Sequence, residues 1–285
     1  MTDSRDLNLL AYNAPEVTAH YAALNYLTPC ERLLFDAYLR PGMAILDLGV
    51  GGGRTTPYLS SMAGRYVGVD YAPEMIARCR KKFSLLEFEV ANATDLSMFA
   101  SSSFDAVVMA FNGMDYVIPD DARWRALREI HRVLRPAGVL VFSSHNPRSI
   151  FVRASWNAQR VANLAGKITG GDSILYRPLL WVVTGARAML AAMQAAARSL
   201  GRMARRVPTS AFWSGQGYLT DPAHGGLRTH LATPAETKRE LGAFGFELLR
   251  ILGDDYPQVS RPYVTDWYYY VFSKAEAPGR SKSCA

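Results

Sequence analysis

Four glycines within the five positions Gly49–Gly53 follow directly on a short apolar run, and this feature restricts the fold more than any other. The run that begins at Met43 has the character of a buried strand, and Arg54–Met62 has the character of a helix. Glycines between them let the backbone turn sharply and let a ligand approach without meeting a Cβ atom. A strand, a glycine-rich turn and a helix in this order predict the first unit of an open α/β sheet.

The rest of the chain continues with alternating helices and strands. We predict helices over Pro15–Arg40, with a break near Thr28, and over Pro73–Phe83, Asp121–Leu134 and Thr233–Phe244. We predict strands over Tyr66–Asp70, Leu86–Val90, Phe104–Phe111, Val139–Ser144, Phe246–Leu252 and Trp267–Ser273. Alternation at short intervals indicates parallel βαβ units, and therefore an α/β fold with helices on both faces of one sheet.

The residues around the glycine turn narrow the kind of ligand that it can hold. Asp70 ends the second predicted strand, where a carboxylate can accept hydrogen bonds from ribose hydroxyls. A dinucleotide site requires a glycine three positions after Gly51, but Arg54 stands there. A Walker loop requires Gly-Lys-Ser/Thr, which this turn lacks. The pattern is instead D-x-G-x-G-x-G, from Asp47 to Gly53.

Together with Asp70, this pattern resembles motif I of the class I S-adenosylmethionine-dependent methyltransferases. Four later segments are also similar to that family: Ala91–Leu96, Phe104–Asn112, Leu127–Gly138 and Asp266–Phe272. The resemblance covers about Met43–Ser144 and Thr233–Ser273. It implies a Rossmann-like seven-stranded sheet of order 3-2-1-4-5-7-6 with the last strand antiparallel. It also implies S-adenosylmethionine as the cofactor.

The resemblance assigns roles around the methionine and ribose parts of this cofactor. Backbone groups of Gly49, Gly51 and Gly53 would contact the methionine moiety. Asp47 would either orient the loop or meet the amino group of the methionine. Asp70 would hold the ribose. Because a carboxylate at a strand end needs a partner, both aspartates point to function more strongly than the glycines do.

The resemblance also assigns residues to the adenine end. Tyr71 or Met75 would pack on the adenine ring, although either could instead be a plain packing residue. Asn92 and Ala93 would contact the edge of the adenine. Many relatives have Asp where this chain has Asn92, whose carbonyl can still accept a hydrogen bond but without charge assistance. Phe111 would lie beneath the cofactor.

Four residues are candidates for acid–base chemistry on the methyl acceptor or for contact with it. Methyl transfer from a sulfonium is an in-line displacement that depends mostly on positioning. A hydroxyl acceptor benefits from a general base, whereas an amine needs only to be unprotonated. His145 follows the fifth strand, Asp115 follows the fourth, and His224 lies near the end of the segment before the sixth, as does His230. Each of these side chains could instead have a structural role.

An insertion of about 85 residues separates the fifth strand from the next helix, and it holds the excess positive charge of the chain. The net charge is +7, yet Phe151–Gly215 contains nine basic residues and one acid. A local excess of this kind argues against a nucleic-acid-binding fold. Residues 178–207 predict an amphipathic helix with a cationic face. It could contact anionic lipids, bind an acidic substrate as a lid, or form a solvated cap or homodimer contact. Four aromatic residues could line an acceptor pocket: Trp156, Trp181, Phe212 and Trp213.

The sequence therefore predicts four parts. These are an N-terminal helical segment (1–42), a cofactor-binding core (43–146 with 231–274), a mainly helical basic insertion (147–230) and a disordered tail (275–285). The cysteines Cys30, Cys79 and Cys284 are too widely spaced for a disulfide framework or a zinc site, so we expect no metal and a reducing, cytoplasmic setting. We find neither an N-terminal signal segment nor a membrane-spanning run.

The resemblance predicts methyl transfer from S-adenosylmethionine to a hydroxyl or amino group of a small metabolite. The segments Phe111–Tyr116 and Phe142–Asn146 are similar to those of bacterial enzymes that modify small molecules, including sugars, and favour a sugar or glycan precursor. Two alternatives stay open. One is a lipid or isoprenoid acceptor at a membrane surface, and the other is a protein that binds the cofactor without turnover.

Overall fold

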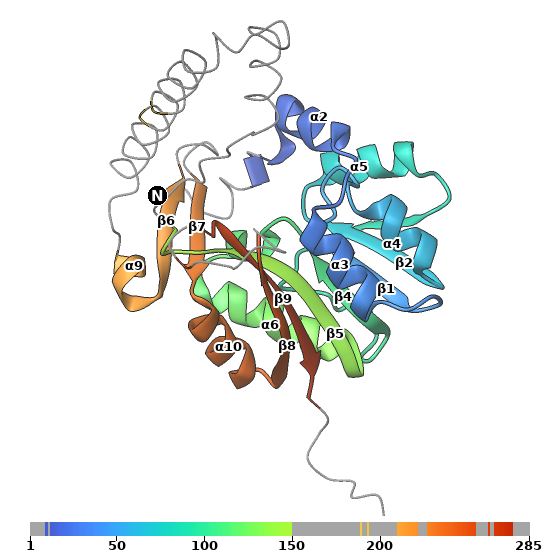
Figure 1. Ribbon diagram of the computed structural model, residues 1–285. Coiled ribbons are helices and arrows are strands. Elements are labelled where there is room, and N and C mark those ends of the chain that lie inside the picture. Colours follow the sequence, from blue (N-terminus) through green and yellow to red (C-terminus); the bar gives the residue numbers. More distant parts are fainter. Residues whose placement is uncertain are drawn as a thin grey trace, which may run out of the picture. The chain divides into compact units, whose positions relative to one another are not determined.

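The computed structural model describes residues 9–10, 12–149, 189, 193, 210–221, 227–254, 262 and 265–275 (Figure 1). Its α-helices are α2 (Pro15–Ala23), α3 (Pro29–Tyr38), α4 (Thr56–Met62), α5 (Pro73–Lys82), α6 (Asp120–Val133), α9 (Ser210–Ser214) and α10 (Pro234–Ala243). A single 3-10 turn, η1, spans Gly113–Tyr116. Its strands are β1 (Ala44–Leu48), β2 (Arg65–Asp70), β3 (Glu87–Val90), β4 (Phe104–Met109), β5 (Leu134–His145), β6 (Gln216–Asp221), β7 (Leu227–Ala232), β8 (Phe246–Gly253) and β9 (Trp267–Lys274). The predicted helices and strands of the core are therefore confirmed, most of them to within two residues at each end.

Seven of these strands form one sheet in the order β3-β2-β1-β4-β5-β9-β8. Strands β1 to β5 pair in parallel, and β9 pairs antiparallel with both β5 and β8. Because β8 and β9 are the sixth and seventh strands of this sheet along the chain, the predicted order 3-2-1-4-5-7-6 is confirmed. In this arrangement the carboxyl ends of β1, β2, β4 and β5 lie at one edge, where ligands bind in open α/β sheets.

Strand β1 is buried on both faces, as expected for the centre of a parallel sheet. Its side chains alternate between two hydrophobic clusters, because successive residues of a strand point to opposite faces. Leu46 and Leu48 belong to the cluster that includes Ile130 of α6. Ile45 belongs to the cluster that includes Phe35 of α3. Burial on both faces fixes the end of β1, and therefore the start of the glycine turn.

Helix α3 begins with a capping box that also prepares a charged contact. The Thr28 side chain accepts a hydrogen bond from the backbone of Glu31, and the Glu31 carboxylate accepts one from the backbone of Thr28. These reciprocal bonds satisfy two backbone donors that the first turn of a helix leaves unpaired. They also hold the Glu31 carboxylate in one position at the start of the helix.

A second, two-stranded sheet pairs β6 with β7 in antiparallel fashion. Helix α9 leads into it, and η1 and β5 contact β7. We predicted only a mainly helical insertion over residues 147–230, so this hairpin was missed. The chain divides into two compact units, one of Met1–Arg148 with Ser210–Ala285 and one of Ser149–Thr209. Nearly all of the second unit lies outside the described residues, as does the predicted helix over 178–207. In the part of the chain that the structure describes, no helix is long and apolar enough to span a membrane.

Candidate active site

A hydrogen bond joins the glycine turn after β1 to the end of β2. The Gly51 backbone has φ of 54°, in the left-handed region that favours glycine, and its N–H donates to Oδ2 of Asp70 over 2.8 Å. Oδ1 of Asp70 accepts from the backbone N–H of Ala72 over 3.0 Å. Burial raises the pKa of Asp70, while these backbone donors act in the opposite direction. A carboxylate offers about four acceptor sites, so Asp70 retains capacity for hydroxyl donors of a ligand.

Asp47 lies behind the turn. Its Oδ2 accepts hydrogen bonds from the hydroxyls of Thr55, over 2.7 Å, and Tyr66, over 2.9 Å. Burial raises the pKa of Asp47 to about 6, although both hydroxyls favour the charged form. Of the two roles predicted for Asp47, these contacts favour orientation of the loop.

A cavity of about 360 Å³ opens beside the turn, at the carboxyl ends of the strands. Eight of the predicted cofactor-binding residues line it: Gly49, Gly51, Asp70, Tyr71, Met75, Asn92, Ala93 and Phe111. The other two, Asp47 and Gly53, do not. The predicted residues from four separate strand ends therefore meet around one space.

Asn92 differs from the prediction in its hydrogen bonding. Its Oδ1 accepts from both the backbone N–H and the hydroxyl of Thr94, each over 3.0 Å. These two bonds occupy both lone pairs of the carbonyl oxygen that we expected to accept from the adenine amine. The Asn92 side chain is exposed, so its Nδ2 and the neighbouring backbone are the groups left for a ligand.

The N-terminal segment contributes to this cavity, which the sequence analysis did not predict. Leu9, Tyr12 and Tyr21 line it together with Tyr71 and Tyr116. The ring of Tyr12 lies 6.0 Å from that of Tyr21, 6.3 Å from that of Tyr71 and 6.0 Å from that of Tyr116. The only hint in the sequence was the recurrence of tyrosine, which does not by itself distinguish a cavity wall from a core.

Arg54, which excluded a dinucleotide site, has a structural partner that sequence reasoning missed. Its guanidinium binds both oxygens of Glu31, with N–O distances of 2.7 and 2.5 Å, and donates to the backbone oxygen of Tyr26. The guanidinium also lies 4.7 Å from the ring centre of Phe111, on the cavity wall. The two side chains of the ion pair are buried, at 7% and 3% exposure. Arg54 thus joins the glycine turn to α3.

The cavity has the features that S-adenosylmethionine needs. The glycine turn presents backbone without Cβ atoms, and the Asp70 carboxylate ends β2. The hydroxyl of Tyr71 is buried and has no hydrogen-bond partner within the described part of the chain, so a ligand can satisfy it. The residues therefore fit the cofactor that the resemblance implied.

A second polar cluster joins the ends of β4 and β5. The Asp115 carboxylate is fully buried and accepts from the Ser144 hydroxyl over 2.7 Å, the His145 backbone over 2.7 Å and Nδ1 of His145 over 2.8 Å. Nδ1 therefore carries a proton, and Nε2 faces Nδ2 of Asn112 at 3.2 Å. This arrangement is that of a histidine oriented by a carboxylate, which suits a general base.

This cluster lies beside the cavity and does not line it. Tyr116 lines the cavity, and its ring meets that of His145 edge to face, with centres 6.4 Å apart. The His145 side chain keeps 24% exposure, whereas that of Asp115 has none. Asp115 is therefore too deeply buried to touch an acceptor and can act only through His145. The third predicted catalytic residue, His224, lies outside the described residues.

His230 lies on β7 and is buried. Desolvation, and to a lesser extent the charge of Arg123, lower its pKa to about 4, so the ring is neutral near pH 7. Arg123 is itself buried, donates from Nε to both oxygens of Glu240 over 2.9 and 3.0 Å, and donates from Nη1 to the backbone oxygen of Met114. These surroundings favour a structural role for His230 over contact with a substrate.

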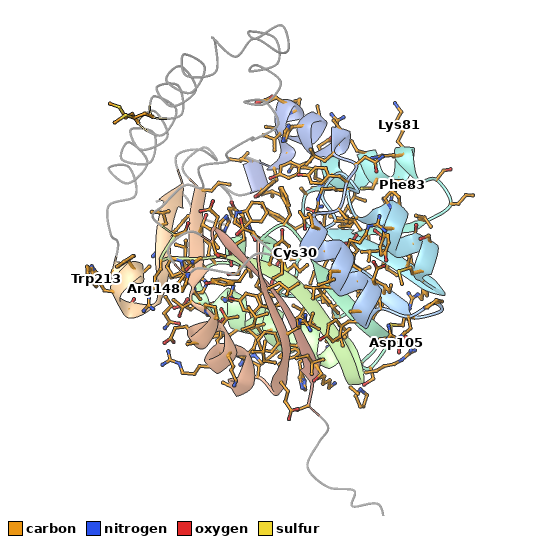
Figure 2. All side chains as sticks on the ribbon, in the orientation of Figure 1. Cys30, Lys81, Phe83, Asp105, Arg148 and Trp213 are labelled. Carbon is orange, nitrogen blue, oxygen red and sulfur yellow. The ribbon has the colours of Figure 1, made fainter. Side chains whose placement is uncertain are left out.

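Of the four aromatic residues proposed for an acceptor pocket, the structure describes Phe212 and Trp213. Trp213 of α9 is 74% exposed, and Figure 2 shows its side chain pointing away from the sheet. The ring of Phe212 packs on it edge to face, with centres 4.9 Å apart. Neither residue lines the cavity described above. Trp156 and Trp181 lie outside the described residues.

Comparison with known proteins identifies a domain within this core. The family model described as a methyltransferase domain matches residues 45–138. Demethylmenaquinone methyltransferase of Beutenbergia cavernae is 38% identical over 112 residues, which are 39% of this chain and 45% of the relative. The enzyme of the same name from Thermus thermophilus is 34% identical over 145 residues, which are 47% and 63% of the two chains. The chain spans about half the length of the curated relatives that it matches.

Solved structures show the same fold at low sequence identity. A methyltransferase from Streptomyces caelestis has a TM-score of 0.56 at 18% identity, covering 93% of this chain and 98% of that one. A Burkholderia thailandensis N1-methyltransferase, solved with 1,6-didemethyltoxoflavin and S-adenosylhomocysteine, has a TM-score of 0.55 at 16% identity, covering 96% of this chain and 87% of that one. At this level of identity the likeness concerns the fold alone.

Proposed function

We propose that this chain, whose residues 45–138 match the methyltransferase domain, is a class I S-adenosylmethionine-dependent methyltransferase that transfers a methyl group to a small-molecule acceptor. One observation supports this proposal above the others. A glycine turn and the Asp70 carboxylate line a single cavity at the carboxyl ends of the parallel strands. This is where open α/β sheets bind their ligands.

The cofactor would be held by residues on three sides of this cavity. The backbone of the glycine turn and the Asp70 carboxylate would border its polar parts, and Met75 and Phe111 would contact its apolar surface. When bound, S-adenosylmethionine supplies a methyl group on a positively charged sulfur. The cavity walls would shield this group from water and fix its direction, which is the main protein contribution to such a displacement.

We propose His145 as the general base for a hydroxyl acceptor, with Asp115 as its positioning residue. With the Nδ1 proton bonded to Asp115, the lone pair that would take a proton from the acceptor is on Nε2. Asn112 occupies that lone pair in this structure, so the acceptor hydroxyl would displace its amide. Replacing His145 with alanine should abolish turnover of a hydroxyl acceptor. Full turnover by this variant would exclude the role, and an amine acceptor would not require it.

Two acceptor classes are supported by different observations. The segments after β4 and β5 favour a hydroxyl or amino group on a sugar or glycan precursor. The names of the relatives, demethylmenaquinone methyltransferase and ubiquinone/menaquinone biosynthesis C-methyltransferase, favour an isoprenoid quinone. Formation of S-adenosylhomocysteine with a panel of sugars and with a demethylated isoprenoid quinol in vesicles distinguishes the two classes. The absence of turnover with every acceptor would support the third reading, a protein that binds the cofactor without catalysis.

The core claim is tested by isothermal titration with S-adenosylmethionine. Asp70→Ala should weaken binding about 10- to 100-fold, because a hydrogen bond to a charged group contributes about 1.5–3 kcal/mol. Asp105→Ala is the matched control. That carboxylate accepts from the backbone of Ala44, where β1 begins, and lies at the opposite edge of the sheet (Figure 2). Absence of binding by the native protein, or equal binding by Asp70→Ala, would contradict the proposal.

We further propose that the core comprises residues 43–146 and 231–274, and that the basic segment 178–207 contacts the acceptor, a membrane surface or a second copy of the chain. Sedimentation with anionic vesicles tests the membrane reading. Binding that falls as salt rises supports it, because surface charge is screened by ions. Absent or salt-independent binding leaves the acceptor lid and the homodimer, which the oligomeric state in solution then distinguishes.

A further inference from the structure

The side-chain amide of Asn112, the residue before η1, faces the ring of His145. Its Nδ2 lies 3.2 Å from Nε2 of His145. The bond from Nδ1 of His145 to Asp115 fixes the tautomer in which Nε2 has no proton and can only accept a hydrogen bond. If the amide oxygen faced Nε2, two acceptors would stand against each other. The Nδ2 donor is therefore the group that faces Nε2.

The backbone of Asn112 holds this amide in place. Its N–H donates to Oγ of Ser143 over 2.8 Å, and its carbonyl oxygen accepts from the N–H of Asp115 over 3.0 Å. Phe111 and Asn112 have φ of 57° and 63°, in the left-handed region that favours glycine. Two successive residues with side chains in this region are strained, and such strain gathers at functional sites.

The other half of the amide has no use in the fold. Asn112 is buried, at 3% exposure, and its Oδ1 has no hydrogen-bond partner among the described residues. Buried polar groups are normally paired, and an unpaired one lowers the stability of the fold. An apolar side chain of similar size would avoid this loss. The contribution of an asparagine at this position is therefore its contact with His145.

The pair of Asn112 and His145 lies next to the cavity. Phe111 and Gly113, the two chain neighbours of Asn112, line the cavity, and so does Tyr116, whose ring meets that of His145. The His145 side chain also keeps 24% exposure. The pair thus borders the space that the proposed function assigns to the cofactor, which is where a methyl acceptor must lie.

A single acceptor atom can contact both groups of the pair. Because Nε2 and Nδ2 are 3.2 Å apart, an atom at about 2.9 Å from each completes a triangle with them. This atom must donate a hydrogen to Nε2, accept one from Nδ2 and keep a lone pair for the methyl group. A hydroxyl oxygen has one hydrogen and two lone pairs, which satisfies all three requirements. A neutral amine has one lone pair, so a bond from Nδ2 would leave none for the methyl group.

Resting on the proposed function, we infer that Asn112 and His145 together select a hydroxyl acceptor, so that the product is a methyl ether. Asn112 orients the hydroxyl oxygen, and His145 takes its proton. In this step the oxygen forms a bond to the methyl carbon, the electron pair of the broken S–C bond stays on sulfur, and the hydroxyl proton passes to Nε2. The buried Asp115 carboxylate balances the charge of the resulting imidazolium.

Nitrogen NMR of the His145 ring tests the geometry without any ligand. In the native protein we expect the proton on Nδ1, and an Nε2 signal that reflects a hydrogen bond from Asn112. Asn112→Gly accepts the left-handed backbone and removes the amide, so it should move the Nε2 signal and leave Nδ1 protonated. A proton on Nε2 in the native protein, or an unchanged Nε2 signal in Asn112→Gly, would overturn the inference.

Turnover with matched acceptors tests the selection itself. The probes are sugars and a demethylated isoprenoid quinol, each paired with the compound in which an unprotonated amino group replaces a hydroxyl. The native protein should form methyl ethers and should methylate the amines about tenfold more slowly. Asn112→Gly should slow methylation of the hydroxyl compounds about 10- to 100-fold, the effect of one hydrogen bond to a charged group, and that of the amines far less. Its affinity for S-adenosylmethionine should be native, since Asn112 does not line the cavity.

Asn146→Ala is the matched control, because Asn146 follows His145 but its buried amide donates to the backbone oxygens of Pro262 and Thr265. This variant should keep the native preference for hydroxyl over amine. A product methylated on nitrogen or carbon, or an unchanged preference in Asn112→Gly, would overturn the inference and leave the proposed function intact. No turnover of any acceptor by a protein that binds S-adenosylmethionine would instead overturn the proposed function.

Discussion

Two buried arginines, Arg54 and Arg123, stand in the two polar regions of this molecule, and their surroundings differ. Arg54 pairs with Glu31, which is 23 residues away in the sequence, and its guanidinium lies on the wall of the cofactor cavity. Arg123 pairs with Glu240, which is 117 residues away, and holds the η1 turn that carries Asp115. The first pair supports a binding surface made of neighbouring segments. The second pair joins α6 to α10 and holds the turn that carries Asp115.

The pairs also differ in how completely they are satisfied. Arg54 binds both oxygens of Glu31, and Glu31 additionally caps α3. Arg123 leaves Nη2 without a hydrogen-bond partner among the described residues, and Nδ1 of His230 is in the same condition. The Arg54 pair is therefore the more completely bonded of the two, whereas the surroundings of Arg123 retain polar atoms without a partner among the described residues.

Removing Arg54 should have the largest effect. Arg54→Leu would leave the Glu31 carboxylate buried without a counter-charge, which costs about 3–5 kcal/mol of folding free energy. Chemical denaturation measures this loss. The double variant with Glu31→Leu should recover much of it, because no unpaired charge remains. A loss below about 1 kcal/mol in the single variant would contradict the structural importance given to this pair.

The pH dependence of stability should show two opposing contributions. Asp47 has a pKa of about 6 in the fold, so its contribution is fully present below about pH 4, the usual aspartate pKa, and is lost as pH rises through 6. His230 has a pKa of about 4, so its contribution is present above about pH 6.5 and is lost as pH falls through 4.

Single variants should separate these contributions. Relative to the native protein, His230→Phe should gain up to about 3 kcal/mol between pH 6.5 and 4, and Asp47→Asn should lose a similar amount as pH falls from 6 to 4. Thermal unfolding measured across this range provides the check. If the stability of both variants and of the native protein changed with pH in the same way, the two opposing contributions would be excluded.

Breaking the second arginine pair should cost less than breaking the first. Glu240 keeps 16% exposure of its side chain, so water can solvate it once Arg123 is gone. We expect Arg123→Leu to lose about 2–3 kcal/mol in the same denaturation assay, below the range for a fully enclosed pair. Affinity for S-adenosylmethionine should stay near the native value, since Arg123 does not line the cavity. A strong loss of affinity would show that the two regions are coupled.

The smallest effect concerns the contact between α2 and the glycine turn. Gly52→Ala introduces a Cβ atom against the backbone of Ala22, so α2 must shift away from the glycine turn. We expect binding of S-adenosylhomocysteine to weaken by several-fold up to about tenfold, with a stability loss near 1 kcal/mol. Titration calorimetry measures the first quantity and denaturation the second. Unchanged affinity would mean that contact between α2 and the turn does not support the cofactor.

The sequence predicted the region around the glycine turn more completely than the region around Asp115 and His145. The glycine turn and Asp70 lie within 24 residues of one another and carry a spacing that few other sites share, so both the fold and most of the cavity lining were predicted. Asp115 and His145 were identified because each follows a parallel strand. Their direct bond could not be predicted, because it depends on the register between β4 and β5.

The features that the sequence did not predict depend mostly on contacts between distant segments of the chain. Nothing in the local sequence indicates that Glu31 pairs with Arg54, or that Tyr12 reaches Tyr71. The hairpin of β6 and β7 was missed because its strands follow a long segment with a helical pattern and lie within the insertion predicted as mainly helical. The one available signal was Gly225-Gly226 shortly before β7, a dipeptide typical of turns.

The place of Trp267 gives this protein a built-in optical signal. Its indole lies opposite His145 in the β5–β9 ladder, with ring centres 6.2 Å apart, and meets the Phe111 ring at 5.2 Å. Phe111 lines the cavity. Indole emission responds to a change in local polarity. A variant that keeps Trp267 as its sole tryptophan should therefore report cofactor binding by fluorescence, without any labelled ligand.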